Sequence, residues 1–541
     1  MTRKILAAAA AVAVAASLHA QGQAAFSADR FRAHVAFLAD DLLEGREAGT
    51  RGHEIAARYV ATQFELLGVK PGAAGRSYFQ PVNLLEVAHT GRAPTLTIKT
   101  PEGRHRLRHT VDALIGGAPD GGTARVNGQT VFVGYGVTDP VLGIDDYAGL
   151  DVRGKVVVAL AAPAPGIDSE IAAHLMSVQR RTAARHGAVG FIGIQTRAAE
   201  KARPFDALMR LADGPATSWE RADGQPGDGS GMKAGALVGP RAAPRLFEGA
   251  PRTLNDVLDE ADRAGARPAG FALKSTVELS VTTAVRRYAS PDVVGLIEGT
   301  DPVLRNEYVV LMAHADHIGV NRSGSGDRIN NGALDNAAGI ATLLEVARTF
   351  ATSTQRPRRS ILLVANTAEE KGLLGAEAFA NNPPVPIERI VAAVDLDMPL
   401  LLYDFTDVVA YGGSHSTLDR AFRAAGAEMG ITLSPDPMPE QTIFVRSDHY
   451  AMAKAGVPAV MLATGMANGG DKAWASFLST QYHQPSDDLT LPIHWNAGAK
   501  FAELNYRAIR ILADSQEPAR WYEGDYFGRV FAPKAAKAPR P

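Results

Sequence analysis

Residues 308–320 read YVVLMAHADHIGV, an apolar run that ends in two histidines and an aspartate within four positions. An apolar run followed at once by polar residues is typical of a buried strand that stops at a surface or a crevice. In an open α/β sheet, ligands collect at the carboxyl ends of the strands. We therefore treat His314, Asp316 and His317 as candidates for a site at one end of a sheet.

From about residue 280 onward, apolar strands alternate with amphipathic helices. This alternation is typical of a largely parallel sheet that is covered on both faces. The sequence thus predicts an α/β fold with a mostly parallel mixed sheet and helices on both faces. One helix is expected at residues 336–351, where the apolar residues share one side. The predicted strands cover residues 292–299, 308–313, 361–366, 390–397, 407–412 and 459–464.

The rest of the chain divides by composition into segments of different character. Residues 31–67 show helical spacing around a glycine-containing turn and predict two helices. Residues 120–275 are rich in glycine and proline and contain short β-like runs, with one helix expected at 171–186, so we predict an inserted β-rich domain. Residues 516–541 form a C-terminal tail, and its last eleven residues are expected to be disordered.

The bulk composition excludes several classes of protein. The 541 residues are enough for two or more domains, and 46% apolar with 21% charged residues is ordinary for a globular chain. Fifty-six basic and fifty-eight acidic residues leave no positive excess that would indicate nucleic acid as a partner. No cysteine is present, so disulfides and thiolate chemistry are excluded and any metal must be held by His, Asp or Glu.

Residues 1–24 combine a basic start, a short alanine-rich apolar run and small residues before Gln21. This is the pattern of a secretory signal peptide, with cleavage expected after Ala20 or Ala24. The apolar run is short and no stop-transfer segment follows it, so we expect no stable membrane span after cleavage. The prediction is a secreted or periplasmic protein.

Residues with metal-binding side chains follow several of the predicted strands. Each alone has an ordinary explanation, such as a helix N-cap for Asp335 or a favourable helix N-terminus for paired glutamates. Together they should converge on one crevice, which argues for a metal site. The candidates are His314, Asp316, Asp335, Glu369, Glu370, Asp397 and, far downstream, His483.

The residue types also restrict the metal. Two histidines with three carboxylates suit Zn²⁺ or another divalent transition metal better than Ca²⁺, which prefers oxygen ligands alone. If one carboxylate bridges, two ions roughly 3.5 to 4 Å apart can each receive one histidine and one further carboxylate. Of two adjacent glutamates, one can then bind metal while its neighbour takes a proton from the attacking water.

Several motifs occur in the order found in one known family: AHADH (313–317), GALDNAAG (332–339), AEEKGLLGA (368–376), DLDM (395–398), RSDHYAMAKAGVP (446–458) and YHQPSDD (482–488). With them the chain resembles the M28-family zinc aminopeptidases that carry a protease-associated (PA) domain insert. The resemblance implies a zinc exopeptidase-like fold with residues 25–119 as the N-terminal part of the peptidase domain. Residues 276–515 would form the metallopeptidase core. The pattern DY.GLDV.GKVVV at residues 146–158 resembles PA domains, which implies a PA-like insert at 120–275.

The resemblance also implies a set of metal ligands. His314 and Asp397 would hold one zinc, while Glu370 and His483 would hold the other. Asp335 would bridge the two ions, so the expected cofactor is two Zn²⁺ per chain.

Other residues receive roles from the same resemblance. Glu369 matches the catalytic base, and Asp316 the carboxylate that orients His314. Tyr482 matches a residue able to hydrogen-bond the developing oxyanion, and Arg446 a position near the substrate or product carboxylate. For His317 we expect a structural hydrogen bond instead of a metal bond.

Two positions depart from the family pattern. Ala315 stands where many relatives have a bulky residue, often Tyr, and Pro399 stands where a small hydrophobic residue is common. Neither change removes a ligand, but both can reshape the pocket. Asp448 and His449 lie in a matching motif, and we expect them to stabilise a loop.

The predicted function is an exported di-zinc aminopeptidase that removes N-terminal residues from peptides, with water activated by metal and Glu369 as general base. A carboxypeptidase or a single-zinc glutaminyl cyclase on the same fold remains an alternative. From a different class, a noncatalytic peptide-binding protein is also compatible with the fold. The sequence leaves open the preferred N-terminal residue, the oligomeric state and the role of the insert.

Overall fold

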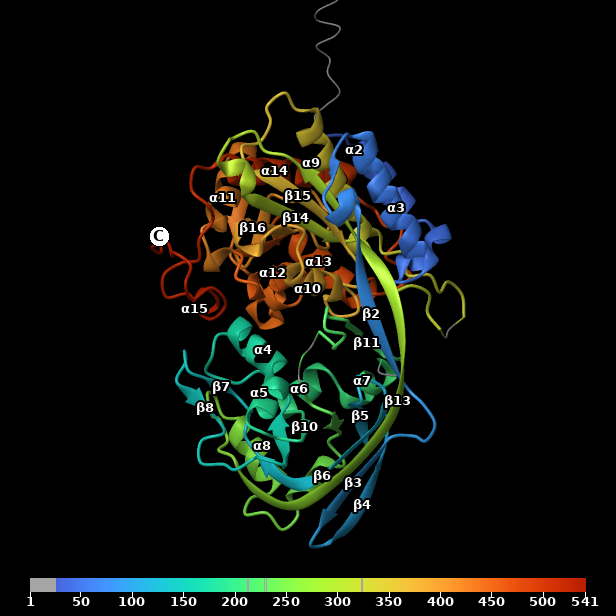
Figure 1. Cartoon of the computed structure of the whole chain (residues 1–541), viewed down its shortest axis with the longest axis vertical. Coiled ribbons are helices and arrows are strands. Elements are labelled where there is room, and N and C mark those ends of the chain that lie inside the picture. Colours follow the sequence, from blue (N-terminus) through green and yellow to red (C-terminus); the bar gives the residue numbers. More distant parts are fainter. Residues whose placement is uncertain (1–25, 212–213, 228, 230, 323–324) are drawn as a thin grey trace, which may run out of the picture.

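The computed structural model describes residues 26–541 except 212–213, 228, 230 and 323–324 (Figure 1). It has an α/β lobe (residues 26–78 and 293–541) and an insert lobe (residues 90–282). Two long antiparallel strands, β2 (Phe79–His89) and β13 (Phe271–Ile297), run from one lobe to the other. The predicted signal peptide, residues 1–24, lies outside the described residues.

The sheet of the α/β lobe has the order β1-β13-β15-β14-β16-β19-β17-β18. Its central strands β15, β14, β16 and β19 are parallel, whereas β13 and β17 run antiparallel to their inner neighbours. The predicted α/β class with a mostly parallel mixed sheet is therefore confirmed. The strand bounds are β1 (Lys70–Pro71), β14 (Tyr308–His314), β15 (Ser360–Asn366), β16 (Ile390–Asp395), β17 (Asp407–Tyr411), β18 (Thr432–Ser434) and β19 (Ala459–Thr464).

Strand β14 shows how this sheet is buried on both faces. Val309 and Leu311 pack into one hydrophobic core, while Val310 and Met312 pack into another, as the two-residue period of a strand requires. The first core is covered by α2 (Ala28–Leu38), α3 (Arg51–Leu66), α9 (Ala338–Thr352), α11 (Leu418–Met429), α13 (Gly470–Thr480) and α14 (Trp495–Asp514). The second is covered by α10 (Leu374–Asn381), α12 (His449–Lys454) and α15 (Tyr526–Phe531).

The insert lobe has its own sheet, in the order β4-β3-β13-β6-β9-β10-β12-β5. Its strands are β3 (Thr95–Thr100), β4 (Gly103–Arg108), β5 (Ala113–Gly117), β6 (Gly122–Phe132), β9 (Val156–Leu160), β10 (Gly190–Ile194) and β12 (Ala234–Val238), while β11 (Ala216–Trp219) pairs with β2. Its helices are α4 (Ser169–Ser177), α5 (Gln179–Arg185), α6 (Arg197–Ala202), α7 (Phe205–Leu211) and α8 (Leu254–Ala261). The helix expected at 171–186 is thus two helices that meet at Val178.

The limits of the insert at residues 120 and 275 stay predictions. Strands β3 and β5 lie before residue 120, yet Leu96, Ile98 and Ile115 pack in the core of the insert lobe. Strand β13 continues across residue 275 without a break, from the insert lobe into the α/β lobe.

Helix α4 of the insert lobe contacts the α/β lobe through polar side chains. Glu170 and Asp525 lie on opposite sides of the His415 ring, which reaches Asp525 Oδ2 through Nδ1 (2.7 Å) and Glu170 Oε2 through Nε2 (2.8 Å). In addition, the Tyr526 hydroxyl donates to Asp139 of the insert lobe (2.7 Å). We call Glu170, His415 and Asp525 the latch.

The expectation of a disordered C-terminus is wrong. Trp521 and Phe527 are buried in the second core of the α/β lobe, and the Trp521 indole N–H donates to the carbonyl of Gly456 (2.9 Å). Ala538 then donates its backbone N–H to the carbonyl of Trp521 (2.9 Å). The last residues are small and polar, but large apolar residues just before them hold them in place. Among the described residues, no helix combines the length and apolar character that a membrane crossing needs.

Candidate metal centre

The carboxyl ends of three neighbouring strands bring the candidate ligands together. Strand β14 ends at His314, Glu369 and Glu370 follow β15, and Asp397 follows β16. Two loops add the remaining candidates, Asp335 just before α9 and His483 just after α13. Because parallel strands end at the same edge of the sheet, residues far apart in sequence meet there.

Asp335 lies between the two histidines. Its Oδ1 is 3.3 Å from His314 Nε2, and its Oδ2 is 3.4 Å from His483 Nε2. His314 Nε2 is also 3.2 Å from Asp397 Oδ1, and His483 Nε2 is 3.0 Å from Glu370 Oε2. Each histidine nitrogen therefore faces one oxygen of Asp335 and one oxygen of a second carboxylate.

These distances fit a divalent metal. Tetrahedral zinc bonds of about 2.0–2.1 Å place neighbouring ligand atoms about 3.3 Å apart, close to the separations observed here. The ligand atoms of His314, Asp335 and Asp397 lie within 4.8 Å of one another. Around the two histidines, Asp316, Asp335 and Asp397 are buried and Glu369 and Glu370 are partly buried, and such an excess of negative charge is costly without a compensating cation. The donor set is thus suited to zinc.

The comparison with known proteins agrees with this site. Residues 292–509 match a family model described as peptidase family M28. This range contains all five predicted metal ligands. Residues 292–509 belong to peptidase family M28. We call this range the M28 domain.

Among the solved structures, an aminopeptidase from Aneurinibacillus sp. strain AM-1 is similar to the chain in fold. The two share 19% sequence identity with a TM-score of 0.50, and the similarity covers 95% of this chain and 98% of the other. The identity is low, so the match shows a shared fold. It extends well beyond the M28 domain.

Among curated relatives, Aminopeptidase NAALADL1 of Mus musculus is 32% identical over 162 residues, which are 29% of this chain and 20% of the mouse protein. A vacuolar membrane protease of Verticillium alfalfae is 46% identical over 52 residues, 10% of this chain and 5% of the fungal protein. The chain thus matches a fifth or less of either relative. Family and fold support the predicted class, a zinc-dependent hydrolase.

Charges in the M28 domain shift the pKa values of the ligands in opposite directions. Burial acts to raise the pKa of Asp335, but hydrogen bonds with His314 and His483 outweigh it and hold that pKa well below its usual range. Burial acts to lower the pKa of His483, but Asp335 and Glu370 raise it to about 10. In the metal-free site these histidines retain protons, so metal binding must displace them.

Glu369 differs from the ligands around it. It is partly buried, and this burial together with the neighbouring Asp397 and Glu370 raises its pKa well above the ordinary value. It makes no short contact to either His314 or His483 among the described residues, although it lines a cavity that Asp335, Asp397 and His483 also line. A carboxylate with a raised pKa beside a metal site is suited to accepting a proton.

Asp316 lies beside His314, but its carboxylate is not the nearest partner of the ring. His314 Nδ1 is 3.1 Å from the backbone carbonyl of Asp316 and 3.9 Å from its carboxylate. That carboxylate instead accepts the backbone N–H of Glu369 (3.1 Å). In this structure Asp316 therefore connects the ends of β14 and β15, and its carbonyl oxygen orients the histidine.

His317 lies closer to the candidate metal ligands than a purely structural role requires. Its Nδ1 is 2.6 Å from Glu370 Oε1, while His483 faces Oε2 of the same carboxylate. Its ligand atom also falls within 4.8 Å of those of Asp335 and Glu370. The expected hydrogen bond is present, and His317 is a second candidate for the position assigned to His483.

The other residues given roles by resemblance lie at or near this site. Tyr482 stacks on the His483 ring with centroids 3.9 Å apart, and burial raises its pKa. Arg446 lines the cavity above the ligands. Asp448 and His449 are buried, and the backbone N–H of His449 donates to Asp395 (3.2 Å), which fits the expected role in a loop.

Sequence reasoning missed two residues that hold the ligand loops. Asp487 accepts the backbone N–H groups of Leu334 (3.0 Å) and Asp335 (2.9 Å) and so fixes the bridging carboxylate. Arg46 is buried and donates to the carbonyls of Ala315 (3.1 Å), Asn331 and Gly332. Asp487 lies inside the motif YHQPSDD, and Arg46 lies in the glycine-containing turn between the two helices predicted at residues 31–67. Their partners are backbone atoms, however, which no sequence pattern reveals.

Three non-glycine residues beside the ligands have left-handed backbone conformations. They are Ala368 (φ 55°), Met398 (φ 46°) and His483 itself (φ 57°). This conformation is uncommon for residues with a side chain and tends to occur where the surrounding structure imposes it. Each of these conformations turns the chain beside a candidate ligand, namely Glu370, Asp397 or His483, and so helps to position its side chain.

The candidate metal centre opens into a cavity of about 350 Å³. Its base carries Asp335, Glu369 and Asp397. Its walls are mainly apolar and include Met398, Tyr411, Met438, Ile443, Met461, Trp474 and Leu478. A small, mainly apolar cavity with a few polar groups is typical of a site for a small ligand.

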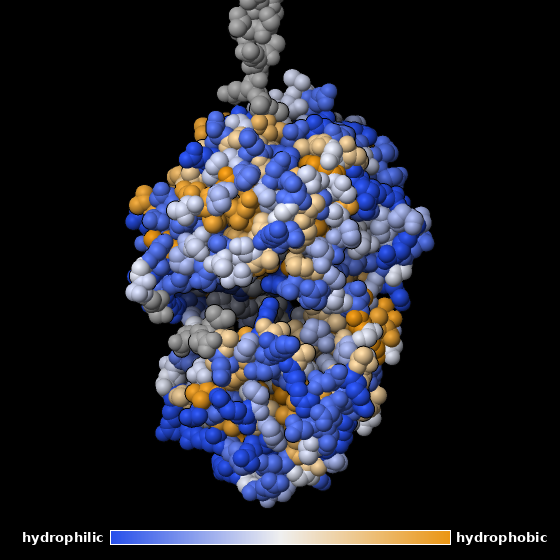
Figure 2. All heavy atoms as spheres, turned by 180° about the vertical axis from the view of Figure 1, so that it is seen from behind, coloured by the Kyte–Doolittle hydropathy of each residue, from blue (hydrophilic) through white to orange (hydrophobic). Residues whose placement is uncertain are grey.

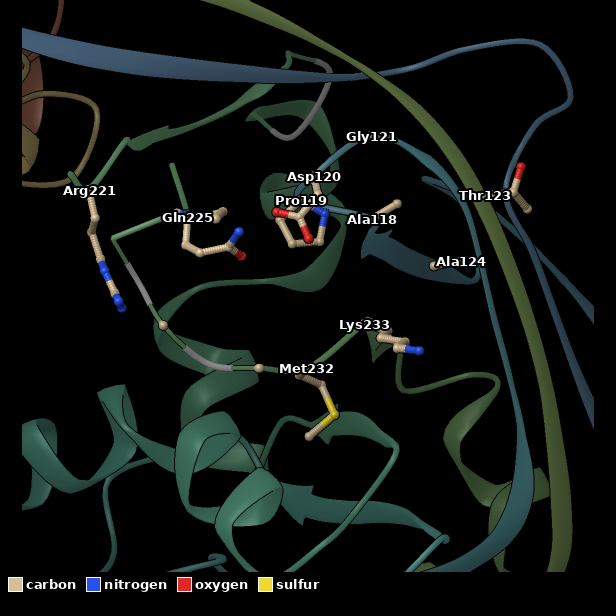
Figure 3. A pocket seen from close by; sticks show the side chains of 13 residues that line it. Ala118, Pro119, Asp120, Gly121, Thr123, Ala124, Arg221, Gln225, Met232 and Lys233 are labelled. Carbon is tan, nitrogen blue, oxygen red and sulfur yellow. The ribbon is translucent and has the colours of Figure 1, made fainter. Parts of the chain in front are cut away.

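Other cavities of the described residues lie outside this site. One of about 550 Å³ in the insert lobe is lined by Pro119, Asp120, Arg221, Gln225 and Lys233, among others (Figure 3). Its described lining residues include no histidine and only one carboxylate, so they do not form a comparable metal site. A cavity of about 790 Å³ is lined by both lobes, and the space-filling view also shows a hollow between them (Figure 2).

Proposed function

We propose that this protein is an exported di-zinc aminopeptidase that hydrolyses N-terminal residues from peptides. The observation that carries the proposal is the position of Asp335, whose two oxygens face His314 and His483 separately. A carboxylate in this position can bridge two ions, and paired ions are typical of hydrolytic sites.

In this proposal each ion has its own pair of ligands besides Asp335. His314 and Asp397 would hold one zinc, and Glu370 and His483 would hold the other. Zinc bound here would supply Lewis acidity toward water and toward the scissile carbonyl.

Glu369 takes the proton from the attacking water, because its raised pKa and its place beside the ligands suit a general base. It then returns that proton to the amine that leaves. Tyr482 donates a hydrogen bond to the oxyanion, since its raised pKa keeps the hydroxyl protonated. Arg446 lies at the cavity and binds a carboxylate of substrate or product.

The test is Glu369→Gln, which keeps the shape of the side chain but cannot accept a proton. Hydrolysis of leucine p-nitroanilide should fall about 10²- to 10⁴-fold, the usual contribution of a general base, while zinc content stays unchanged. An active Glu369→Gln enzyme would overturn this mechanism.

Two further measurements separate the alternatives on the same fold. A carboxypeptidase accepts N-acetylated peptides, whereas an aminopeptidase requires the free amine. One zinc per chain instead of two would favour the cyclase mode. A wild-type protein that binds peptides but hydrolyses none of them would support the noncatalytic alternative.

Export rests on the signal-like pattern of residues 1–24. N-terminal sequencing of the protein recovered from outside the cytoplasm should begin at Gln21 or Ala25. A mature chain that still begins at Met1 would contradict export by a cleaved signal.

A further inference from the structure

The cavity above the candidate metal centre is lined by arginines from both lobes. Arg446 belongs to the M28 domain, whereas Arg203 comes from the insert lobe, directly after α6. Both side chains are exposed, and both line the same cavity as Asp335 and Glu369. The insert lobe therefore contributes a charged group to the substrate cavity.

The backbone of Arg203 is held firmly although its side chain is exposed. Its N–H donates to the carbonyl of Ala199 (2.8 Å), and its carbonyl accepts from the side-chain amide of Gln195 (2.9 Å). Pro204 follows and disfavours helical geometry at Arg203, which adopts φ −139° and ψ 88°. Next along the chain, Phe205 is buried and donates its N–H to Glu200 (3.1 Å). The backbone that carries the Arg203 guanidinium is thus fixed in position beside the cavity.

Several arginines of the insert lobe pair with carboxylates, whereas Arg203 has no such pair among the residues that the structure describes. Arg197 contacts Asp259 (2.8 Å) and Asp262 (2.5 Å), and Arg267 contacts Asp146 (2.6 Å). Among the described residues, Arg203 has no carboxylate within ion-pair distance. Within the described residues, the Arg446 side chain likewise makes one hydrogen bond, from Nη1 to the carbonyl of Gln441 (3.3 Å). Two guanidinium groups that have no carboxylate partner in the described part of the chain line one cavity, and they favour an anionic group on the ligand.

The rest of the cavity restricts where that anionic group can lie. The base carries carboxylates, and the apolar walls suit the side chain of an apolar N-terminal residue. A volume of about 350 Å³ is near the small end of ligand sites, which span roughly 300–1,000 Å³, so a bound ligand is short. The anion must therefore be close to the scissile bond, on the leaving part of the substrate.

We propose that Arg203 of the insert lobe, together with Arg446, binds a carboxylate on the residue that follows the scissile bond. The preferred substrates are then dipeptides, whose C-terminal carboxylate lies there, or peptides with an acidic second residue. This inference rests on the proposed aminopeptidase function. It gives the insert lobe a direct role in choosing the substrate.

The test compares four substrates that share an N-terminal leucine: Leu-Gly, Leu-Gly amide, Leu-Asp amide and leucine p-nitroanilide. The variants are Arg203→Ala and Arg203→Lys in the full chain. Lys201→Ala is the matched control, because Lys201 is an exposed cation on α6 that does not line the cavity. Far-ultraviolet circular dichroism and zinc content check that each variant is folded and loaded.

For wild type we expect Leu-Gly to be preferred over its amide, mainly through a lower KM. Arg203→Ala should lower kcat/KM for Leu-Gly about 10- to 100-fold, the effect of losing a hydrogen bond between charged groups. For Leu-Gly amide and leucine p-nitroanilide, kcat/KM should change less than about twofold. The Arg203→Lys variant should retain part of the activity toward Leu-Gly that Arg203→Ala loses. Lys201→Ala should match wild type.

The pattern across substrates distinguishes the outcomes. A selective loss with Leu-Gly alone identifies the C-terminal carboxylate, and a selective loss with Leu-Asp amide alone identifies the acidic side chain. An equal loss on all four substrates, or none, would overturn the role of Arg203 while leaving the aminopeptidase proposal intact. A wild-type enzyme that cleaves none of them overturns both.

Discussion

His314 in the M28 domain and His415 in the latch each lie between two carboxylates, but the geometry differs. One nitrogen of His314, Nε2, faces both Asp335 (3.3 Å) and Asp397 (3.2 Å). His415 uses both nitrogens, so Asp525 and Glu170 lie on opposite sides of its ring. The carboxylate oxygens around His314 all face one nitrogen and could share one metal ion, whereas those around His415 face different nitrogens and could not.

This difference shows that residue types alone do not identify a metal site. At the latch, a protonated histidine donates a hydrogen bond to each carboxylate and joins the two lobes. At His314, two carboxylate oxygens compete for one nitrogen, and further buried carboxylates lie nearby. A metal cation between these atoms would compensate their negative charge. Each cluster can be tested by changing one residue and asking whether metal or stability is lost.

The largest effect is expected for Asp335→Ala. This change removes the oxygens that face both His314 and His483, so zinc content should fall at both positions and hydrolysis should become undetectable. The measurements are metal analysis and leucine p-nitroanilide turnover. The matched control is Asp525→Ala at the latch, which should keep its zinc. Full zinc content in Asp335→Ala would contradict a bridging role.

The two histidines beside Glu370 should differ in their effects. His483→Ala should lose one zinc per chain together with activity, because His483 is the proposed ligand. His317→Ala should keep both ions and weaken zinc affinity by about 10- to 100-fold, as expected for a residue that supports a ligand. Chelator competition measures these affinities. If the two results are reversed, His317 is the ligand.

At the latch, His415→Gln should lower stability and leave zinc content unchanged. Breaking a buried ion pair by removing one partner typically costs about 3–5 kcal/mol, and His415 is only 12% exposed. Chemical unfolding, followed by tryptophan fluorescence, measures the loss. A matched change at the exposed His494, which has no ion-pair partner among the described residues, should have little effect. Loss of zinc in His415→Gln would remove the distinction between the clusters.

The smallest expected effect is the pH dependence of the latch. Burial opposes protonation of His415, but Asp525 and Glu170 raise its pKa from 6.5 to about 9. The folded protein holds this proton to higher pH than the unfolded chain, so the stabilisation is complete below pH 6.5 and is lost as pH rises through 9. Between pH 7 and pH 9 the loss should be about 2 kcal/mol. His415→Gln should lack this component, and an equal slope in that variant would exclude the latch as its source.

The α/β sheet and the candidate ligands could be predicted because both leave local signals. Strands β14 and β15 are continuous apolar runs, and His314, Glu369 and Glu370 stand just beyond them. Polar residues after buried strands are visible in a sequence without any knowledge of packing. The pairing of each histidine with its carboxylates came from the family resemblance and remains a proposal.

Other features could not be predicted because their partners lie far away in the chain. Arg46 holds backbone carbonyls that are 269 to 286 positions distant, and no residue pattern marks them. The full length of β13 could not be predicted either. Its residues alternate between buried and exposed in the insert lobe but are nearly all buried in the α/β lobe, so no single pattern marks the whole strand. Arg203 lies in a segment to which no sequence motif gives a role. Its place in the cavity depends on how the lobes are arranged.

The packing of α2 against α9 has a consequence for the order in which the chain is made. Arg30 on α2 pairs with Glu345 on α9, which lies 315 positions later. At roughly 5–20 residues per second, synthesis needs roughly 15–60 s to cover that distance. Phe31 and Val35 have no native core to enter during this interval. We therefore expect α2 to be the segment of the nascent chain that most needs shielding until α9 emerges.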